Sequence, residues 1–475
     1  MASIRKAGSI SAGGNIVVLC YKAKPSFGIN DEEYNYLKKQ IEEQKKKTIV
    51  FNRLSHHLVF IVADGKQDKY KRYETLRRNG NEVASLLNGN KATSVLVVDE
   101  TAEKENALAI AEGIALGCYQ FIRHRKEKEK EKNSLHDIVV HSSKVNEKDI
   151  IELNAVVEAT SAARDLVNEP VNVLNAEGLA EAFQKMGKQA GFKVEVFNKQ
   201  KIESLKMGGL LAVNKGSVDP PTFSVMEYKP ANAKNKKPFV LVGKGLVYDT
   251  GGLSLKPTPN SMDSMKCDMA GGAVVGCTLF ALAKAKIPVH VIGLVPSTDN
   301  RPGFNAFAPG DIITMHDGTT VEMLNSDAEG RMILADALSY AKKFDPRLVM
   351  EFSTLTGAAA AAIGSNGVVM MGNADEKVKD KVMKSGSRVH ERLVEFPFWE
   401  DYDDLLKSDI ADMKNIGGPY AGAITAGRFL VKFTDYPYLH FDIAGPAFIN
   451  AKDGYRSKGG TGVGVRLLFD FFKGI

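Results

Sequence analysis

The segment PFVLVGKGLVYDTGGLSLKP, residues 238 to 257, joins a short apolar run to a loop rich in glycine. The run PFVLV has the length and valine content of a buried strand. The loop behind it carries Lys244, Asp249 and Lys256. Glycines let a backbone turn sharply and approach a ligand closely. Because ligands of open α/β sheets bind beyond the carboxyl ends of the strands, we expect a site at this point.

Short strands and amphipathic helices alternate along the rest of the chain. Five strand-like segments near the N-terminus are NIVVLCYK, TIVFNRL, HLVFIVADG, TSVLVVDE and HDIVVHSS. Later ones are PVHVIGLV, RLVMEFSTL and YLHFDIAG. We therefore predict an α/β protein of two domains, with a small N-terminal α/β domain at 1–146, a linking helix at 147–170 and a larger α/β domain at 171–475.

The bulk composition fits this division. A chain of 475 residues is too long for one compact core, and its 44% hydrophobic and 25% charged residues are ordinary for a globular protein. No apolar run approaches the roughly 18 residues of a membrane span. The first thirty residues lack acids, as in a transit peptide, but we favour a first strand at IVVLCY that follows a short tail.

Cysteine usage and charge exclude several classes of protein. The cysteines Cys20, Cys118, Cys267 and Cys277 form no CxxC pair, which disfavours a disulfide scaffold or a thiolate zinc site and fits a reducing compartment. The net charge of +6 is modest, and the runs KKQIEEQKKK and RHRKEKEKEKN mix both signs. Such runs are typical of solvated surface and do not favour a DNA-binding stripe, although the basic pI permits DNA binding as a second function.

Two further segments carry acids at the start of helical patterns. MDSMKCDMAGG contains Asp268, and NSDAEGR contains Asp327, Glu329 and Arg331. Taken alone, each acid has a structural explanation, and Ser326-x-x-Glu329 fits a capping box at the start of the helix RMILADALSYAKKF. Both explanations of NSDAEGR, a helix start and a ligand cluster, are compatible.

Together the acids favour a metal site. If the segments converge, four carboxylates share one crevice, and they cannot all ionise at close range without positive charge between them. Two divalent cations fit this number of oxygen ligands. No HExxH motif is present, and we expect His316 to be structural.

The basic residues of these segments have distinct possible roles. A neutral Lys244 could bind a metal, whereas Lys256 suits a charged donor to an oxyanion. Arg331 suits a bidentate anion such as a carboxylate, phosphate or bicarbonate. These residues predict a two-metal site without naming the reaction, so phosphoryl transfer or phosphate hydrolysis remains an alternative, although no GxxxxGK[ST] loop is present. Binding without catalysis is a further alternative, and it would predict damage to the set of metal ligands.

GKGLVYDTGGLSLKP, MDSMKCDMAGG and NSDAEGRMILADAL resemble the signature segments of the leucyl aminopeptidase family. STLTGA at 353–358 and DIAG at 442–445 also resemble that family, and the similarity covers residues 165–475. It implies a metal-dependent aminopeptidase that releases N-terminal, leucine-like residues from peptides with a free N-terminus. It also implies that the C-terminal domain is catalytic, with a central mixed sheet flanked by helices, in a cytoplasmic homohexamer.

The resemblance also assigns roles to individual residues. It makes Lys244, Asp249, Asp268, Asp327 and Glu329 the ligands of two divalent ions (Zn or Mn, with Co or Mg possible), Lys256 and Arg331 the catalytic pair, and Met265, Asn325, Thr354, Leu355 and Gly357 substrate-binding residues. Asp249 and Glu329 would bridge the two ions.

The resemblance implies a mechanism too. A water held between the metals would attack the scissile carbonyl, Lys256 would stabilise the oxyanion, and Arg331 would hold bicarbonate as the general base. The free α-amine of the substrate would bind one metal. Two positions depart from the family pattern: Ser326 stands where threonine is usual, and the segment from Lys256 to Asp268 is one residue longer.

Overall fold

The alternation of strands and helices is realised in a computed structural model, which describes residues 2–10 and 13–475. The chain divides into two compact units. The N-terminal unit comprises Met1–Ser161, Arg388–His390 and Ala451–Lys458, and the C-terminal unit comprises Ala162–Ser387, Glu391–Asn450 and Gly459–Ile475. Helix α5 (Glu147–Asn168) covers the predicted linking stretch. The α/β class is confirmed, and the boundaries at residues 146 and 170 stay predictions.

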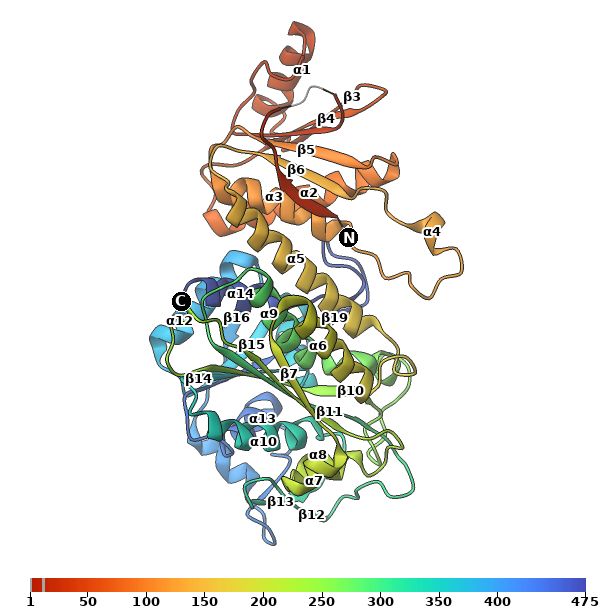
Figure 1. Cartoon of the computed structure of the whole chain (residues 1–475), viewed down its shortest axis with the longest axis vertical. Coiled ribbons are helices and arrows are strands. Elements are labelled where there is room, and N and C mark those ends of the chain that lie inside the picture. The colour runs from red at the N-terminus through yellow and green to blue at the C-terminus, as the bar shows by residue number, and fades with distance from the viewer. Residues whose placement is uncertain (1, 11–12) are drawn as a thin grey trace. The chain divides into compact units, whose positions relative to one another are not determined.

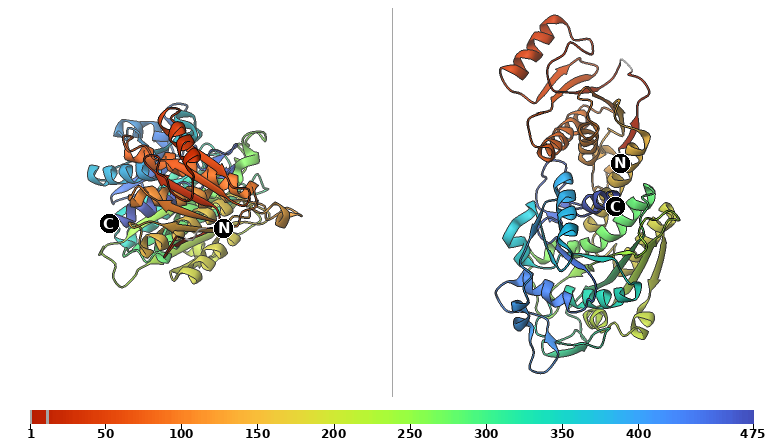
Figure 2. Two further views of the ribbon diagram at one scale, coloured as in Figure 1. Left: turned by 90° about the horizontal axis from the view of Figure 1, so that it is seen from above. Right: turned by 90° about the vertical axis from the view of Figure 1, so that its left-hand side faces the viewer.

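The N-terminal unit contains one six-stranded sheet, in the order β1-β6-β5-β2-β4-β3. All neighbours are parallel except β3 and β4. Its strands are β1 (Ser3–Lys6), β2 (Ile16–Cys20), β3 (Thr48–Asn52), β4 (His57–Val62), β5 (Ser94–Asp99) and β6 (Asp137–His141). Helix α1 (Asp31–Glu42) covers one face, and α2 (Lys69–Gly89) and α3 (Lys104–Gly117) cover the other (Figures 1 and 2). The charged run at 123–133 forms a loop with one helical turn, α4 (Lys128–Glu131).

The first strand lies earlier than the sequence indicates. We expected IVVLCY to be the first strand after a short tail, but Ser3–Lys6 already forms β1. This strand pairs in parallel with β6, from Ser3 opposite Asp137 to Lys6 opposite Val140. The expectation of a tail is wrong because a distant partner strand supplies the hydrogen bonds that this short polar segment needs.

The C-terminal unit contains a mixed sheet in the order β16-β15-β18-β14-β9-β11-β8-β7, with β10 paired to β11. Strands β18, β14, β9 and β11 are mutually parallel, whereas β15, β8 and β7 pair antiparallel. The strands are β7 (Lys193–Phe197), β8 (Thr222–Tyr228), β9 (Phe239–Gly243), β10 (Gly245–Asp249), β11 (Val291–Asn300), β14 (Leu348–Ser353), β15 (Val368–Gly372), β16 (Leu393–Glu395) and β18 (Tyr438–Asp442). The predicted mixed sheet is confirmed.

Helices cover both faces of this sheet (Figure 1). On one face lie α6 (Ala176–Ala190), α9 (Ala270–Lys284) and α14 (Val465–Lys473), and on the other α8 (Gly208–Asn214), α10 (Gly330–Ala341) and α13 (Gly422–Val431). The helix α10 and the strands β9 and β11 share one buried apolar core. Smaller elements are α7 (Lys199–Ser204), α11 (Gly357–Ile363), α12 (Glu376–Val389), β12 (Asp311–Thr314), β13 (Thr320–Met323), β17 (Met413–Lys414), β19 (Phe448–Ile449), β20 (Gly459–Gly460) and the 3-10 turns η1 (Met262–Met269), η2 (Lys342–Phe344), η3 (Gly364–Asn366) and η4 (Glu400–Leu406).

One helical stretch reaches the length and apolar composition of a membrane span. This stretch, Met262–Lys284, consists of η1 followed directly by α9. The expectation that no apolar run approaches the length of a membrane span is therefore wrong. Of its most apolar window, 83% is buried inside the fold. Because α9 packs against β9, β11, β14 and α14, we interpret the stretch as a core helix of the C-terminal unit.

Candidate metal centre

The carboxyl ends of the four parallel strands meet at one edge of the C-terminal sheet. Lys244 follows β9, Asn300 ends β11, Thr354 follows β14 and Asp442 ends β18. The crevice beyond such ends is where ligands of open α/β sheets bind. The predicted site therefore lies where the strand pattern indicated.

The segment GLVYD, which we expected to be part of a loop, is the strand β10. It pairs in parallel with β11, with Gly245 opposite Ser297 and Asp249 opposite Asn300, and its register is irregular between Leu246 and Asp249. A side chain on Gly245 would lie 2.5 Å from the carbonyl oxygen of Pro296. The glycine thus serves close strand packing, and Asp249 is fixed at the end of a strand.

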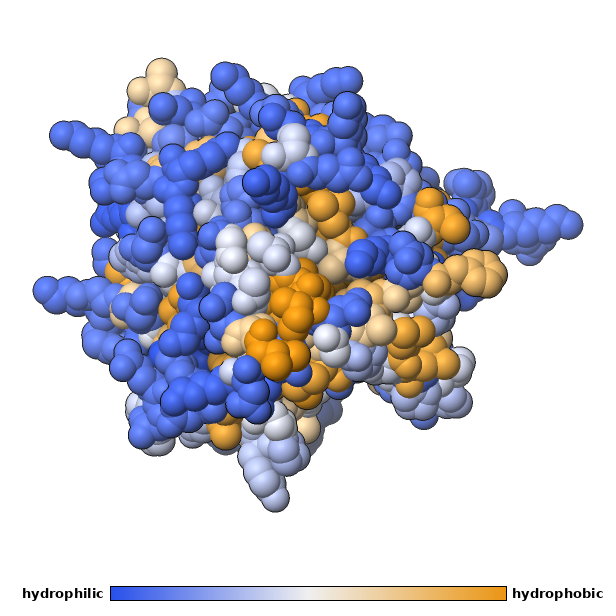
Figure 3. Space-filling view, turned by 90° about the horizontal axis from the view of Figure 1, so that it is seen from below, coloured by the Kyte–Doolittle hydropathy of each residue, from blue (hydrophilic) through white to orange (hydrophobic). Residues whose placement is uncertain are grey.

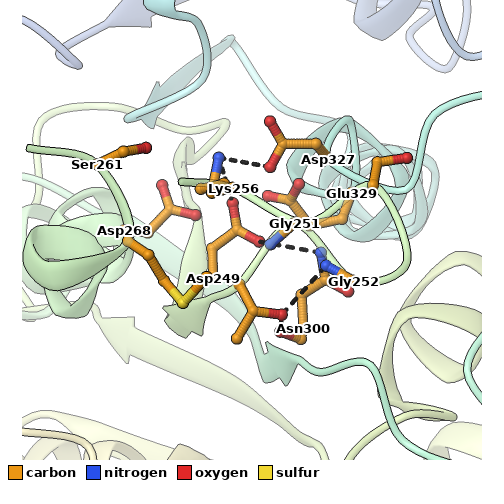
Figure 4. Close-up of polar contacts among 12 residues, drawn as sticks. Asp249, Gly251, Gly252, Lys256, Ser261, Asp268, Asn300, Asp327 and Glu329 are labelled. Carbon is orange, nitrogen blue, oxygen red and sulfur yellow. Dashed lines mark hydrogen bonds and ion pairs between the residues drawn. The ribbon is translucent and has the colours of Figure 1, made fainter. Parts of the chain in front are cut away.

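Three of the predicted acidic ligands lie together and are buried. One carboxylate oxygen from each of Asp249, Asp268 and Glu329 lies within 4.8 Å of the other two. Asp249 ends β10, Asp268 lies in η1 and Glu329 is the residue before α10 (Figure 4). At 1–3% exposure, these acids have little water to solvate their charge.

Two lysines pair with these acids and with Asp327. Lys244 Nζ lies 2.7 Å from Asp268 Oδ2 and 2.8 Å from Glu329 Oε1. Lys256 Nζ lies 2.9 Å from Asp249 Oδ2 and 2.5 Å from Asp327 Oδ1 (Figure 4). The structure brings all five predicted ligands and Lys256 into one cluster.

Burial and mutual repulsion perturb the pKa values of the cluster. Burial raises the pKa of Asp268 and of Glu329, and the nearby carboxylate of Asp249 raises both further. For Lys244, burial opposes the charged form, but the carboxylates of Asp268 and Glu329 outweigh it and raise the pKa. Lys244 is therefore an ammonium in the metal-free protein and must lose a proton before it can bind a metal.

The donor set fits divalent cations. Four carboxylates face two ammonium groups, so full ionisation of the acids would leave two negative charges in a site of low exposure and calls for bound cations. Glu329 Oε2 is buried and has no hydrogen-bond partner among residues 2–10 and 13–475. An unpaired buried carboxylate oxygen is costly unless a cation binds it, and oxygen ligands suit divalent ions.

Ser326 does not cap the helix that follows it. The residue before α10 is Glu329, and it has no side-chain capping hydrogen bond. The Ser326 hydroxyl instead donates to the carbonyl oxygen of Gly251 at 2.7 Å and accepts from Ser254 N–H at 2.7 Å. The predicted capping box is wrong because this hydroxyl forms hydrogen bonds that connect NSDAEGR to the segment Gly251–Ser254.

Asn300 is a site residue that the sequence did not reveal. Its Nδ2 donates to Asp249 Oδ1 at 2.9 Å (Figure 4). It also donates to the carbonyl oxygen of Ser326 at 2.9 Å. It is fully buried. One amide thus holds a predicted ligand, Asp249 of β10, and the start of the acidic segment before α10. The available signal was a polar TDN run at the end of an apolar strand.

Arg331 lies in the first turn of α10 and is 7% exposed. Its Nη1 donates to the carbonyl oxygen of Asn415 at 2.7 Å, and its guanidinium lies 6.0 Å from the ring centre of Phe429. Burial lowers the pKa of Arg331 to about 10, against the charges of Glu329 and Asp442. Nε is buried without a partner among the described residues, so this guanidinium retains a free donor.

The predicted substrate-binding residues lie on three segments, and two of them contact predicted ligands. Thr354 Oγ1 donates to Asp268 Oδ1 at 2.6 Å, and Leu355 N–H donates to Asp442 Oδ1 at 3.2 Å. Asn325 Oδ1 accepts from Asp327 N–H at 2.8 Å. Met265 is half-buried in η1, one turn before Asp268, and Gly357 is exposed at the start of α11.

Comparison with known proteins identifies the family. The cytosol aminopeptidase family, catalytic domain, matches residues 161–469, and the cytosol aminopeptidase family, N-terminal domain, matches residues 36–128. A probable cytosol aminopeptidase of Chlorobaculum tepidum is 47% identical over 435 residues, 87% of this chain and 85% of the relative. One from Azoarcus sp. is 41% identical over 88% of this chain and 84% of the relative.

Solved structures of two enzymes are also similar. A tomato leucine aminopeptidase mutant matches with a TM-score of 0.88 and 26% identity, over 100% of this chain and 97% of the other. The bottromycin maturation enzyme BotP in complex with Mn matches with a TM-score of 0.85 and 27% identity, over 97% and 99%. The chain therefore belongs to the cytosol aminopeptidase family and is a metal-dependent hydrolase that releases N-terminal residues from peptides.

Proposed function

We propose that this aminopeptidase holds two divalent metal ions with Lys244, Asp249, Asp268, Asp327 and Glu329. The observation that carries this proposal is the unpartnered, buried Glu329 Oε2 beside two further acids within 4.8 Å. Metal ions bound there would supply Lewis-acid chemistry, polarising a carbonyl and acidifying water. The residues around them would position the substrate and stabilise its charge.

Lys256 is proposed to stabilise the oxyanion that develops on the scissile carbonyl. Its ammonium is 15% exposed and lies between Asp249 and Asp327, so it is fixed before substrate arrives. Burial opposes its charge, but the carboxylates of Asp249 and Glu329 outweigh burial and raise its pKa. A charged donor fixed in a site of low exposure is an effective oxyanion partner.

Arg331 is proposed to hold a bicarbonate ion that acts as the general base. Its unpartnered Nε and its burial support a role as an anion site, because a guanidinium presents several donors in a fixed plane. The hydrogen bond from Nη1 to the carbonyl oxygen of Asn415 holds the group in place. Proton removal by the bound ion would then occur beside the ligand cluster.

The substrate is proposed to be a peptide with a free N-terminus and a leucine-like first residue. Met265, Asn325, Thr354, Leu355 and Gly357 would line its pocket. Thr354 contacts Asp268 directly, which supports a pocket continuous with the ligands. A free α-amine is a ligand that an acylated N-terminus cannot offer, so acylated peptides should react poorly.

Hydrolysis of leucine-p-nitroanilide by metal-stripped protein, before and after addition of Mn²⁺ or Zn²⁺, tests this function. We expect activity to return with metal on the free amine and to stay absent on N-acetyl-leucine-p-nitroanilide. Lys256→Gln should retain metal binding and lose turnover by roughly 100-fold or more. Metal restoration of equal rates on both substrates would contradict the proposed amine recognition.

Zinc or manganese is the proposed metal, with cobalt or magnesium as weaker candidates. Carboxylate-rich sites accept all of these ions, and the nitrogen of Lys244 favours the transition metals over magnesium. The related structure of BotP is described in complex with Mn. Metal analysis of the protein purified without added metal would identify the ion.

A homohexamer is the proposed assembly, in the cytoplasm. The C-terminal unit exposes many large apolar side chains, and the face in Figure 3 carries an apolar patch. Large exposed apolar patches mark interaction sites. The large apolar side chains of the C-terminal unit that are at least half exposed are Val173, Val218, Leu255, Phe304, Trp399, Ile410 and Tyr420. The four cysteines are free and buried, as suits a reducing compartment. Analytical ultracentrifugation would test the assembly, and a monomer at micromolar concentration would contradict it.

A further inference from the structure

The N-terminal unit contains a cavity of about 530 Å³ at the carboxyl ends of its parallel strands. Tyr21 directly follows β2, and Val62 ends β4; both line the cavity. The chain proceeds from β2 to β4 on one side and from β5 to β6 on the other, so the strand order reverses between β2 and β5. Open α/β sheets bind ligands at such a reversal.

Two lining residues, Tyr21 and Glu103, belong to a hydrogen-bonded network, and we call this part of the cavity its floor. The Tyr21 hydroxyl donates to Glu103, and Arg72 donates to Glu103 Oε2 at 2.6 Å. Asn106, which is fully buried, donates to the Tyr21 oxygen at 3.1 Å and accepts from Arg72 Nε at 3.2 Å. Glu103 itself remains 41% exposed, so its oxygens can accept further hydrogen bonds from a ligand.

Lysines form the rim. The sequence KKQIEEQKKK mixes signs, but the fold separates them: Lys45, Lys46 and Lys47 line the cavity, together with Lys66 from the loop after β4. Lys47 lies 3.5 Å from Asp64, which also lines the cavity. In the part of the chain that the structure describes, Lys46 and Lys66 form no ion pair, so their charge is available.

We propose that this cavity binds a small phosphorylated molecule that also carries hydroxyl groups, such as a nucleotide. The lysine rim would hold the phosphate, and Glu103 would accept hydrogen bonds from sugar hydroxyls at the floor. A volume of about 530 Å³ lies within the usual range for small-molecule sites. All the groups belong to the N-terminal unit, so the site does not depend on the metal chemistry.

The test is isothermal titration of the full-length protein with AMP, and separately with adenosine and with inorganic phosphate. We expect a submillimolar Kd for AMP and binding at least tenfold weaker for the other two. The double variant K46Q/K66Q should weaken AMP binding by roughly tenfold, since exposed charges each contribute little. The control K38Q/K71Q removes the same charge from exposed positions outside the cavity and should leave the Kd unchanged.

Both lysine variants should keep the wild-type circular dichroism spectrum and urea unfolding profile, which verifies their fold, and they should keep wild-type aminopeptidase activity because the metal centre lies in the other unit. Glu103→Gln should weaken AMP and leave phosphate binding unchanged, because it removes an acceptor for hydroxyls alone. The proposal is overturned if AMP gives no heat at millimolar concentration or if K46Q/K66Q matches wild type. If inorganic phosphate bound as tightly as AMP, the proposed contact between Glu103 and the sugar hydroxyls would be refuted. If AMP did not bind, but duplex DNA bound in a salt-sensitive manner that required Lys46 and Lys66, these lysines would belong to a nucleic-acid-binding surface and the proposed small-molecule site would be wrong.

Discussion

Replacing Asn300 by alanine should loosen the metal centre without removing a ligand. The Asn300 amide holds Asp249 Oδ1 and the carbonyl oxygen of Ser326, each at 2.9 Å, in a fully buried position. In the variant, the Ser326 carbonyl loses this donor, which costs about 1–3 kcal/mol for a buried acceptor. Asp249 Oδ1 keeps the Gly251 N–H at 2.8 Å, so its loss is nearer to 1 kcal/mol.

The free energy of unfolding should therefore fall by about 2–4 kcal/mol. Metal affinity should fall as well, because Asp249 and the segment before α10 are no longer held by one group. Loss of a group that orients metal ligands typically weakens binding by roughly 10- to 100-fold. Competition with a chromophoric chelator measures this affinity directly, and urea unfolding of chelator-treated protein measures the stability.

Asn214→Ala is the matched control. Asn214 is also buried in the C-terminal unit, and its Nδ2 donates to the carbonyl oxygen of Asp219 at 2.8 Å and to Thr298 Oγ1 at 3.1 Å. It contacts none of the proposed ligands, so its variant should lose stability and keep its metal affinity. If Asn300→Ala and Asn214→Ala bind metal equally well, the reasoning about ligand positioning is refuted.

Three further substitutions test neighbouring features. A methyl group on Gly330 would lie 2.5 Å from Lys244 Cε, so Gly330→Ala should weaken metal binding by roughly tenfold in the chelator assay; unchanged affinity would contradict the tight packing. Ser326→Ala should lower the free energy of unfolding by about 1–2 kcal/mol and leave helical circular dichroism unchanged, whereas loss of helix signal would restore the capping role. Burial opposes charge on His440, but Glu351 outweighs it and raises the His440 pKa. The contribution of the His440–Glu351 pair to the free energy of unfolding is therefore complete below about pH 6.5, the pKa of an unfolded histidine, and is lost as the pH rises through the pKa of His440 in the folded protein. The urea midpoint of the wild type should fall over this pH range, and that of His440→Gln should not.

The sequence predicted the buried parallel strands well, because such strands are continuous apolar runs. PFVLVG, PVHVIGLV, RLVMEFSTL and YLHFDIAG all correspond to strands of the central sheet. The acids were found for a related reason, since they follow or precede those runs. Local pattern was sufficient wherever burial alone determined the structure.

Prediction failed where a distant partner decided the outcome. Strand β10 lies among glycines, and within residues 2–10 and 13–475 its one partner strand is β11, so its sequence was interpreted as a loop. Ser326 fits a capping motif, but its hydroxyl contacts Gly251 and Ser254, which lie far away in the sequence. For Asn300 the sequence offered only the polar TDN run at the end of an apolar strand, and its role depends on two segments that meet at one amide.

The parallel pairing of the central sheet also sets the order in which the enzyme can become active. Strand β9 (Phe239–Gly243) pairs with β14 (Leu348–Ser353), and β14 pairs with β18 (Tyr438–Asp442). Such long-range pairing is slow, because each strand must wait for a partner made much later. During synthesis, the proposed ligands Lys244 and Asp249 emerge well before β14 and β18 can support them. We therefore expect the metal centre to form only after β18 has been synthesised, late in the production of the chain.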